Sequence, residues 1–127
     1  MLFKNGDLTL FQDQAYLALT TFRRNGAPVA TPVWFAQEDQ RLYIMTGADT
    51  GKVRRIRNNA QVEVAPCTIS GGLLGPSLEA MARLLHDDEK VHANQVLNRK
   101  YGWQKRFYDL TYLLRGRERS YIEITLM

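Results

Sequence analysis

Residues 16–35 read YLALTTFRRNGAPVATPVWF, and this stretch predicts the start of the fold. Residues 16–22 alternate in polarity and are rich in residues that favour strands, so we expect a β-strand there. The pair Asn25-Gly26 is typical of a hairpin turn, because both residues tolerate the positive φ that tight turns require. Residues 29–36 then return as the second strand. The stretch therefore predicts an antiparallel hairpin.

The rest of the chain extends this pattern into a mainly β fold. Pro32 has no N–H to donate, so the second strand is expected to be an edge, or bulged, at that point. Residues 77–85 alternate like a strand but have the composition of a helix, and we favour the strand. Helices are expected at residues 52–58 and 87–114, with Gly102 breaking the second. Six strands are expected in all, at residues 16–22, 29–36, 41–46, 61–67, 77–85 and 119–126. This order suggests a small six-stranded antiparallel β-barrel with short peripheral helices.

Length and composition are those of an ordinary globular domain. The chain has 127 residues, of which 45% are hydrophobic and 24% charged, so we expect one domain over residues 1–127. Cys67 is the only cysteine, which excludes an internal disulfide, and His86 and His92 give a metal ion little to bind. No run approaches the roughly 18 apolar residues of a membrane span, and the charged start is unlike a secretory leader. We therefore expect a cytoplasmic protein without a metal or a membrane partner.

Basic residues gather in one informative segment, residues 46–57, which read TGADTGKVRRIR. The whole chain has a formal net charge of +4, which suits an anionic partner but does not identify it. A helix is expected to begin near Thr50, where unpaired backbone N–H groups attract anions. Gly51 admits a close approach, Lys52 is a compact cation, and Arg55 offers a planar fork to phosphate oxygens. Spacing alone leaves two interpretations open, a phosphate site and a solvated basic helix face.

No catalytic constellation is visible in the sequence. Residues 47–52 resemble the end of a phosphate loop but lack the Ser or Thr that follows its lysine. Cys67 has no evident base to activate it, so a half-buried place near a strand end is expected. Trp34 is either a core residue or a contact for a planar ligand, since the backbone freed at Pro32 can offer polar groups there.

Residues 16–35, residues 41–67 (RLYIMTGADTGKVRRIRNNAQVEVAPC) and the run Lys100-Tyr101-Gly102-Trp103 resemble the pyridoxamine 5'-phosphate oxidase-like split-barrel proteins. The group that uses the deazaflavin coenzyme F420 is the most similar. The resemblance implies a six-stranded split barrel that works as a homodimer, with a flavin or deazaflavin in a groove between the subunits. After Cys67 the chain departs from the family, because its loop is less polar.

The resemblance also implies which residues bind the cofactor. The ring would stack along Pro32, Val33, Trp34 and Phe35. The phosphate would be held by Thr46, Thr50, Gly51, Lys52 and Arg55. Additional cations nearby, Arg57 together with Arg54, Arg23 and Arg24, would favour F420, because its arm continues into an acidic tail of glutamates.

The function that follows is an F420-dependent oxidoreductase acting on a small organic substrate. The cofactor carries the hydride in such proteins, so no catalytic side chain is required. FMN is the alternative cofactor, since it shares a tricyclic ring and a phosphate arm. A protein that only carries a cofactor or a tetrapyrrole is a further alternative. A nucleic-acid partner is not expected, because the aromatic residues of the late basic segment fit a helix packed on the barrel.

Overall fold

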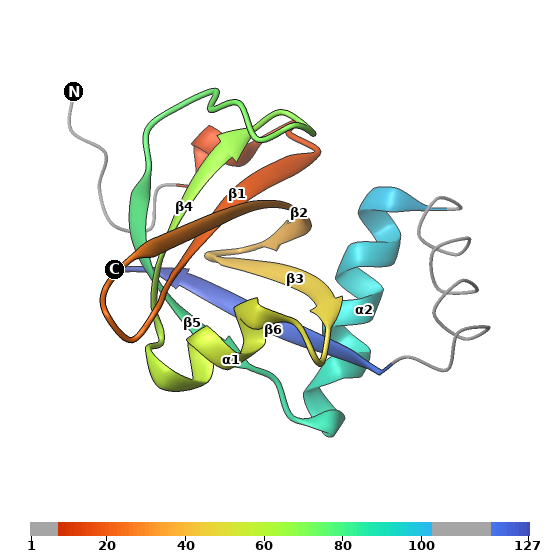
Figure 1. The fold of residues 1–127 in the computed structure, drawn as a ribbon. Helices are drawn as coiled ribbons and strands as arrows, with labels where there is room; N and C mark the ends of the chain where they lie inside the picture. Colours follow the sequence, from red (N-terminus) through yellow and green to blue (C-terminus); the bar gives the residue numbers. More distant parts are fainter. Residues whose placement is uncertain (1–7, 103–117) are drawn as a thin grey trace.

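The computed structural model describes residues 8–102 and 118–127 (Figure 1). A short 3-10 helix, η1 (Thr9–Phe11), precedes the first strand. The described strands are β1 (Tyr16–Phe22), β2 (Pro28–Glu38), β3 (Arg41–Gly47), β4 (Gln61–Cys67), β5 (Leu78–Leu84) and β6 (Arg119–Leu126). Helix α1 (Gly51–Asn58) follows β3, and helix α2 (Asp87–Tyr101) follows β5. Every predicted strand is present, and the ambiguous segment at residues 77–85 is a strand, as predicted.

These strands form a closed antiparallel barrel in the order β1-β2-β3-β6-β5-β4. Closure follows from β1, which pairs with β2 on one side and with β4 on the other. The turn between β1 and β2 uses Gly26 at a φ of 88°, and the Asn25 side chain accepts a hydrogen bond from the N–H of Ala27. The prediction of a mainly β, six-stranded antiparallel barrel is therefore confirmed.

The barrel splits along β2. The first part of this strand, from Pro28 to Trp34, pairs with β1, whereas its pairing with β3 begins only at Phe35. Beyond Ile44, β3 turns away from β2 and continues alongside β6 as far as Gly47. The predicted edge at Pro32 is thus confirmed, because among the described strands only β1 lies beside this part of β2.

Two apolar clusters hold the elements in place. The first fills the barrel interior and includes Leu17, Leu19, Phe35, Leu42, Ile44, Val62 and Ile122. The second lies between α2 and the outer surface of the sheet, where Ala93, Val96 and Leu97 meet Ala36, Tyr43, Met45 and Tyr121. Burying each large side chain stabilises the fold by about 1.5–3 kcal/mol. Packing in the barrel interior and under α2 therefore holds β2 and β3 in place on either side of the split.

Helix α2 ends where the sequence predicts a break. Gly102 caps it at a φ of 58°, a conformation that favours glycine, and its N–H bonds the Asn98 carbonyl. The rest of the predicted helical region, residues 103–114, lies outside the described residues, as does Trp103 of the family pattern. None of the described helices is both long enough and apolar enough to cross a membrane.

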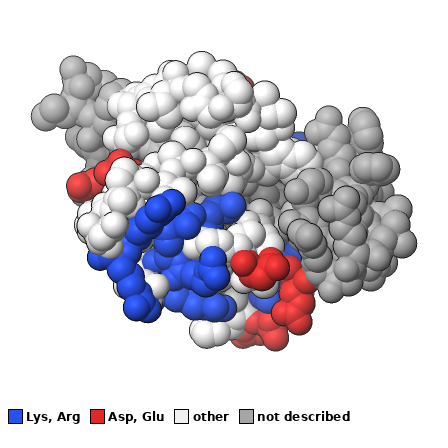
Figure 2. Space-filling view, viewed as in Figure 1, with Lys and Arg blue, Asp and Glu red and all other residues white. Residues whose placement is uncertain are grey.

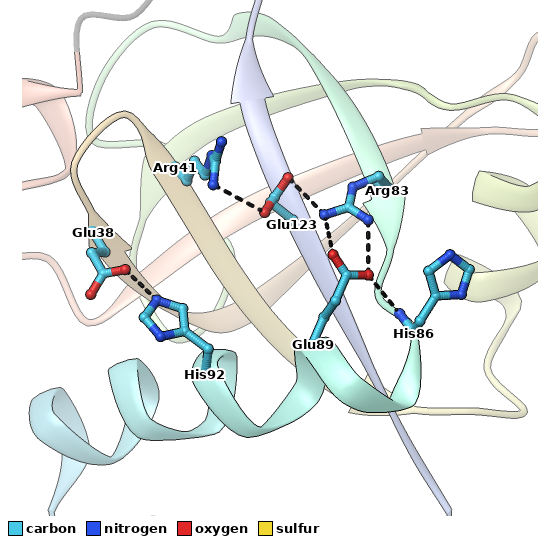
Figure 3. A network of polar contacts seen from close by, with 7 residues as sticks. All are labelled: Glu38, Arg41, Arg83, His86, Glu89, His92 and Glu123. Atoms are coloured by element: carbon cyan, nitrogen blue, oxygen red, sulfur yellow. Dashed lines mark hydrogen bonds and ion pairs between the residues drawn. The ribbon is translucent and has the colours of Figure 1, made fainter.

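Polar contacts fasten the start of α2 to the barrel (Figure 3). The Arg83 guanidinium donates to both carboxylate oxygens of Glu89, at 2.9 and 2.7 Å, and reaches Glu123 at 3.3 Å. Glu89 also accepts the N–H of His86 at the helix start. Further along α2, His92 contacts Glu38 at the end of β2. These contacts fix the helix against β2, β5 and β6.

Candidate functional site

A pocket of about 380 Å³ lies beside the split between β2 and β3. Its volume falls within the range typical of small-molecule sites. It is lined by Tyr16, Pro32, Val33, Trp34, Met45, Thr46, Lys52 and Ile69. Of the residues that the sequence predicts for a cofactor, it gathers Pro32, Val33, Trp34, Thr46 and Lys52. Tyr16 was not predicted from the sequence as a pocket residue. The hairpin register pairs Tyr16 with Trp34 and could have indicated its place beside the pocket.

The backbone of β2 explains why proline is tolerated beside the pocket. The N–H of Phe35 bonds the Tyr101 hydroxyl at 2.9 Å, and that hydroxyl also lies 2.8 Å from the Ala15 carbonyl on the β1 side. Phe35 therefore directs its backbone polar groups toward β1. Successive residues of a strand direct these groups to opposite edges, so those of Trp34 and of Pro32, two positions before it, point to the edge away from β1. A missing N–H at Pro32 costs no ladder hydrogen bond.

Trp34 and Phe35 lie on opposite faces of β2. Trp34 is half-buried, lines the pocket and stacks on Tyr101, with ring centroids 4.5 Å apart and planes 10° from parallel. Phe35 is fully buried inside the barrel, edge-to-face with Phe11. The Trp34 indole, stacked on Tyr101, therefore forms part of the pocket wall, whereas the Phe35 side chain belongs to the core.

The start of α1 brings two cations close together. Lys52 lines the pocket, and burial lowers its pKa, with a further lowering by the nearby Arg55 guanidinium. Nε of Arg55 donates to Oγ1 of Thr21 at 2.6 Å. A Cβ at Gly51 would lie 2.6 Å from Nη1 of Arg55, so the glycine makes room for that guanidinium. Among the described residues, neither Lys52 nor Arg55 has a carboxylate partner.

The remaining predicted residues support or surround this pair. The Thr50 hydroxyl donates to the Gly47 carbonyl at 2.9 Å and so fixes the loop before α1. Arg57 and Arg54 are exposed on α1, outside the pocket lining, and Arg23 and Arg24 are exposed in the turn between β1 and β2. Figure 2 shows Lys and Arg atoms gathered over α1 and this turn, with acidic atoms in separate groups at the left and at the lower right of the basic area.

Among the described residues, groups that could act directly in catalysis are scarce near the pocket. Cys67 is buried at the end of β4, and burial raises the pKa of its thiol, which disfavours a reactive thiolate. Within residues 8–102 and 118–127, no three His, Cys, Asp or Glu side chains are grouped to hold a metal ion. The arrangement can instead bind a molecule with a flat apolar part and an anionic arm.

A split antiparallel barrel with a pocket at the split and basic residues at the following helix start defines a class of cofactor-binding proteins. Residues 8–122 match the family model described as pyridoxamine 5'-phosphate oxidase, and the chain belongs to this family. No protein of curated function matches the chain by sequence.

Solved structures share the fold at low sequence identity. An F420 reductase is 18% identical with a TM-score of 0.61, over 98% of this chain and 96% of that one. A FAD-binding protein from Mesorhizobium loti is 13% identical with a TM-score of 0.65, over 92% and 82% of the two chains. The heme storage protein HutZ from Vibrio cholerae is 16% identical with a TM-score of 0.65, over 93% and 85%. At these identities the likeness concerns the fold alone.

Proposed function

We propose that the protein is an F420-dependent oxidoreductase that binds its cofactor in the pocket at the split of β2 and β3. One observation carries the proposal: Lys52 lines the pocket beside Pro32, Trp34 and Met45, and Arg55 lies close enough to Lys52 for the two charges to interact. Neither cation has a carboxylate partner among the described residues. Two adjacent cations repel each other and favour an anion between them. A phosphate arm would satisfy them, and a flat ring would cover the apolar wall.

The residues present fit such a cofactor, and their roles follow from their chemistry. When bound, the deazaflavin supplies the hydride chemistry. Lys52 and Arg55 would hold the phosphate through charge-assisted hydrogen bonds. Trp34, supported by Tyr101, and Pro32 would place the ring and exclude water from one side of it. The protein therefore contributes binding and orientation, in keeping with the shortage of candidate acid–base groups.

Charge beyond the pocket favours F420 over FMN. Arg54 and Arg57 are exposed on α1, and Arg23 and Arg24 are exposed in the neighbouring turn. FMN ends at its phosphate, whereas the glutamate tail of F420 continues past it. A chain of carboxylates leaving the pocket would gain from this basic surface, by an amount that falls with added salt.

The proposal includes a second copy of the chain. The first part of β2 offers an edge beside the pocket, and Ile69, Leu73 and Leu74 in the loop between β4 and β5 are 69%, 61% and 56% exposed. Ile69 also lines the pocket, so an apolar surface runs from the pocket to the outside. A homodimer would cover this surface and complete the groove. Sedimentation equilibrium at micromolar concentration should give twice the 14.6 kDa chain mass, and a stable monomer would contradict this part of the proposal.

Side-by-side fluorescence titrations of cofactor-stripped protein with F420 and FMN test the choice of cofactor. We expect F420 to bind more tightly, and the double variant Arg54→Ala, Arg57→Ala to lose affinity for F420 but not for FMN. Equal loss for both ligands, or tighter binding of FMN, would contradict the F420 proposal. Tight F420 binding without oxidation of the reduced cofactor by any of a panel of small organic acceptors would instead indicate a carrier.

A further inference from the structure

Thr21 interrupts an otherwise apolar row inside the barrel. Leu17, Leu19 and Thr21 occupy alternate positions of β1, and all three are fully buried. A buried hydroxyl that lacks a hydrogen bond destabilises a protein, and valine has nearly the same shape without that requirement. Packing alone therefore does not account for threonine at this position.

The Thr21 hydroxyl contacts a residue 34 positions away in the chain. It accepts a hydrogen bond from Nε of Arg55 at 2.6 Å. On its other side the guanidinium lies against Gly51, where a Cβ would approach Nη1 to 2.6 Å. The hydrogen bond to Thr21 therefore orients the Arg55 guanidinium, Gly51 leaves room for it, and its terminal nitrogens have no hydrogen-bond partner among the described residues.

An arginine held in this way is prepared for an anion. A free arginine side chain loses rotamer entropy when it is fixed, and that loss would otherwise be subtracted from ligand affinity. The Nε atom is occupied by Thr21, so the two Nη groups are left to form paired hydrogen bonds with phosphate oxygens. Lys52 lies nearby with its pKa lowered, which again favours an anion at this point.

We propose that Thr21 is a positioning residue that orients Arg55 for the phosphate of the bound cofactor. The inference rests on the phosphate site of the proposed function, but it does not depend on the choice between F420 and FMN. Thr21 acts only through Arg55, so its effect should be confined to phosphorylated ligands.

Titrations with FMN and riboflavin at one fixed salt concentration test this role, because the two probes differ only in the phosphate. Thr21→Val should weaken FMN binding about tenfold, the scale of one hydrogen bond to a charged group, and leave riboflavin binding unchanged. Thr21→Ser should retain the affinity for FMN. The matched control is Thr20→Val, on the neighbouring half-buried threonine of β1, which should bind both probes like the original protein.

A double-mutant cycle separates this role from simple packing. In an Arg55→Met background, Thr21→Val should cause no further loss of FMN affinity. The positioning role would be overturned if Thr21→Val weakened the binding of FMN and riboflavin equally, or did not weaken FMN binding at all. The phosphate site would still be upheld in that case if Arg55→Met weakened FMN binding. If the original protein binds FMN and riboflavin equally, the phosphate site itself fails, and the proposal for Thr21 fails with it.

Discussion

The basic side chains on the two sides of the barrel differ in whether they have carboxylate partners. On the α2 side, most described cations have carboxylate partners: Arg83 contacts Glu89 and Glu123, Arg41 contacts Glu123, Lys90 contacts Asp87, and Arg99 contacts Glu38. On the α1 side, Arg23, Arg24, Lys52, Arg54, Arg55 and Arg57 have none among the described residues. The cations on both faces are lysines and arginines, so the presence of carboxylate partners is what distinguishes the two faces.

We interpret this difference as one between charges that stabilise the fold and charges that, in the proposed function, bind a ligand. Glu89 holds the start of α2, and its hydrogen bonds from Arg83 and His86 lower its pKa to about 2, so its charged form is favoured in the folded state. Lys52 has the opposite balance, because burial and Arg55 lower its pKa and disfavour its charge. A cation kept at some cost to the free protein is typical of a binding site.

The largest expected effect is at Lys52. Lys52→Met should weaken the binding of F420 or FMN by about ten- to a hundredfold, because it removes a charge-assisted hydrogen bond to the phosphate. The cofactor-free variant should be at least as thermostable as the original protein at neutral pH, since a disfavoured charge is gone. Lys90→Met, which removes a cation already paired with Asp87, is the control and should leave binding unchanged. Loss of thermostability with intact binding in Lys52→Met would place Lys52 with the structural charges.

A smaller effect is expected on the paired face. Glu89→Gln should lower the thermal midpoint by a few degrees near neutral pH, because Arg83 and the His86 N–H lose a charged acceptor. The folded pKa of about 2 lies below the ordinary value of 4.5. The advantage of the original protein is therefore complete above pH 4.5 and disappears as the pH falls toward 2. Thermal melts of both proteins across this range measure it, and an unchanged difference at low pH would contradict the assignment.

The smallest effect concerns Lys100, an exception on the α2 side. Its ammonium lies 3.5 Å from the Phe35 ring centroid, and burial lowers its pKa to about 8 from 10.5. The folded protein thus releases this proton earlier than the unfolded chain. Lys100→Met should be slightly more stable below pH 8, and the original protein should recover the difference as the pH rises from 8 to 10.5. Denaturant melts at several pH values check this, and a constant difference between the two proteins would refute it.

Local features of the fold were predictable because their causes are local. The turn at Asn25-Gly26 depends on backbone preferences within a few residues, and the edge at Pro32 depends on its missing N–H. The basic start of α1 follows from residues that are adjacent in sequence. The residues next to each other in the sequence are therefore sufficient to predict these features.

Features of the site that depend on distant partners were not predictable in this way. Tyr101 stacks on Trp34 across 67 positions of the chain only because α2 packs on the outer surface of the sheet. Likewise, the contact of Arg55 with Thr21 requires α1 to lie against β1. Phe35 shares a strand with Trp34, and only the barrel closure shows that its side chain belongs to the interior. Pairings of this kind follow from the fold as a whole.

A crystal structure of the protein with F420, or with FMN if that ligand binds more tightly, tests the central claim most directly. A second pocket, of about 340 Å³ and lined in part by Arg99 and Lys100, lies on the α2 side and offers a competing location. We predict that the phosphate lies within hydrogen-bond distance of Lys52 Nζ and the Nη atoms of Arg55, with the ring along Pro32 and Trp34. A phosphate bound beside Lys100, or anywhere away from α1, would contradict the account.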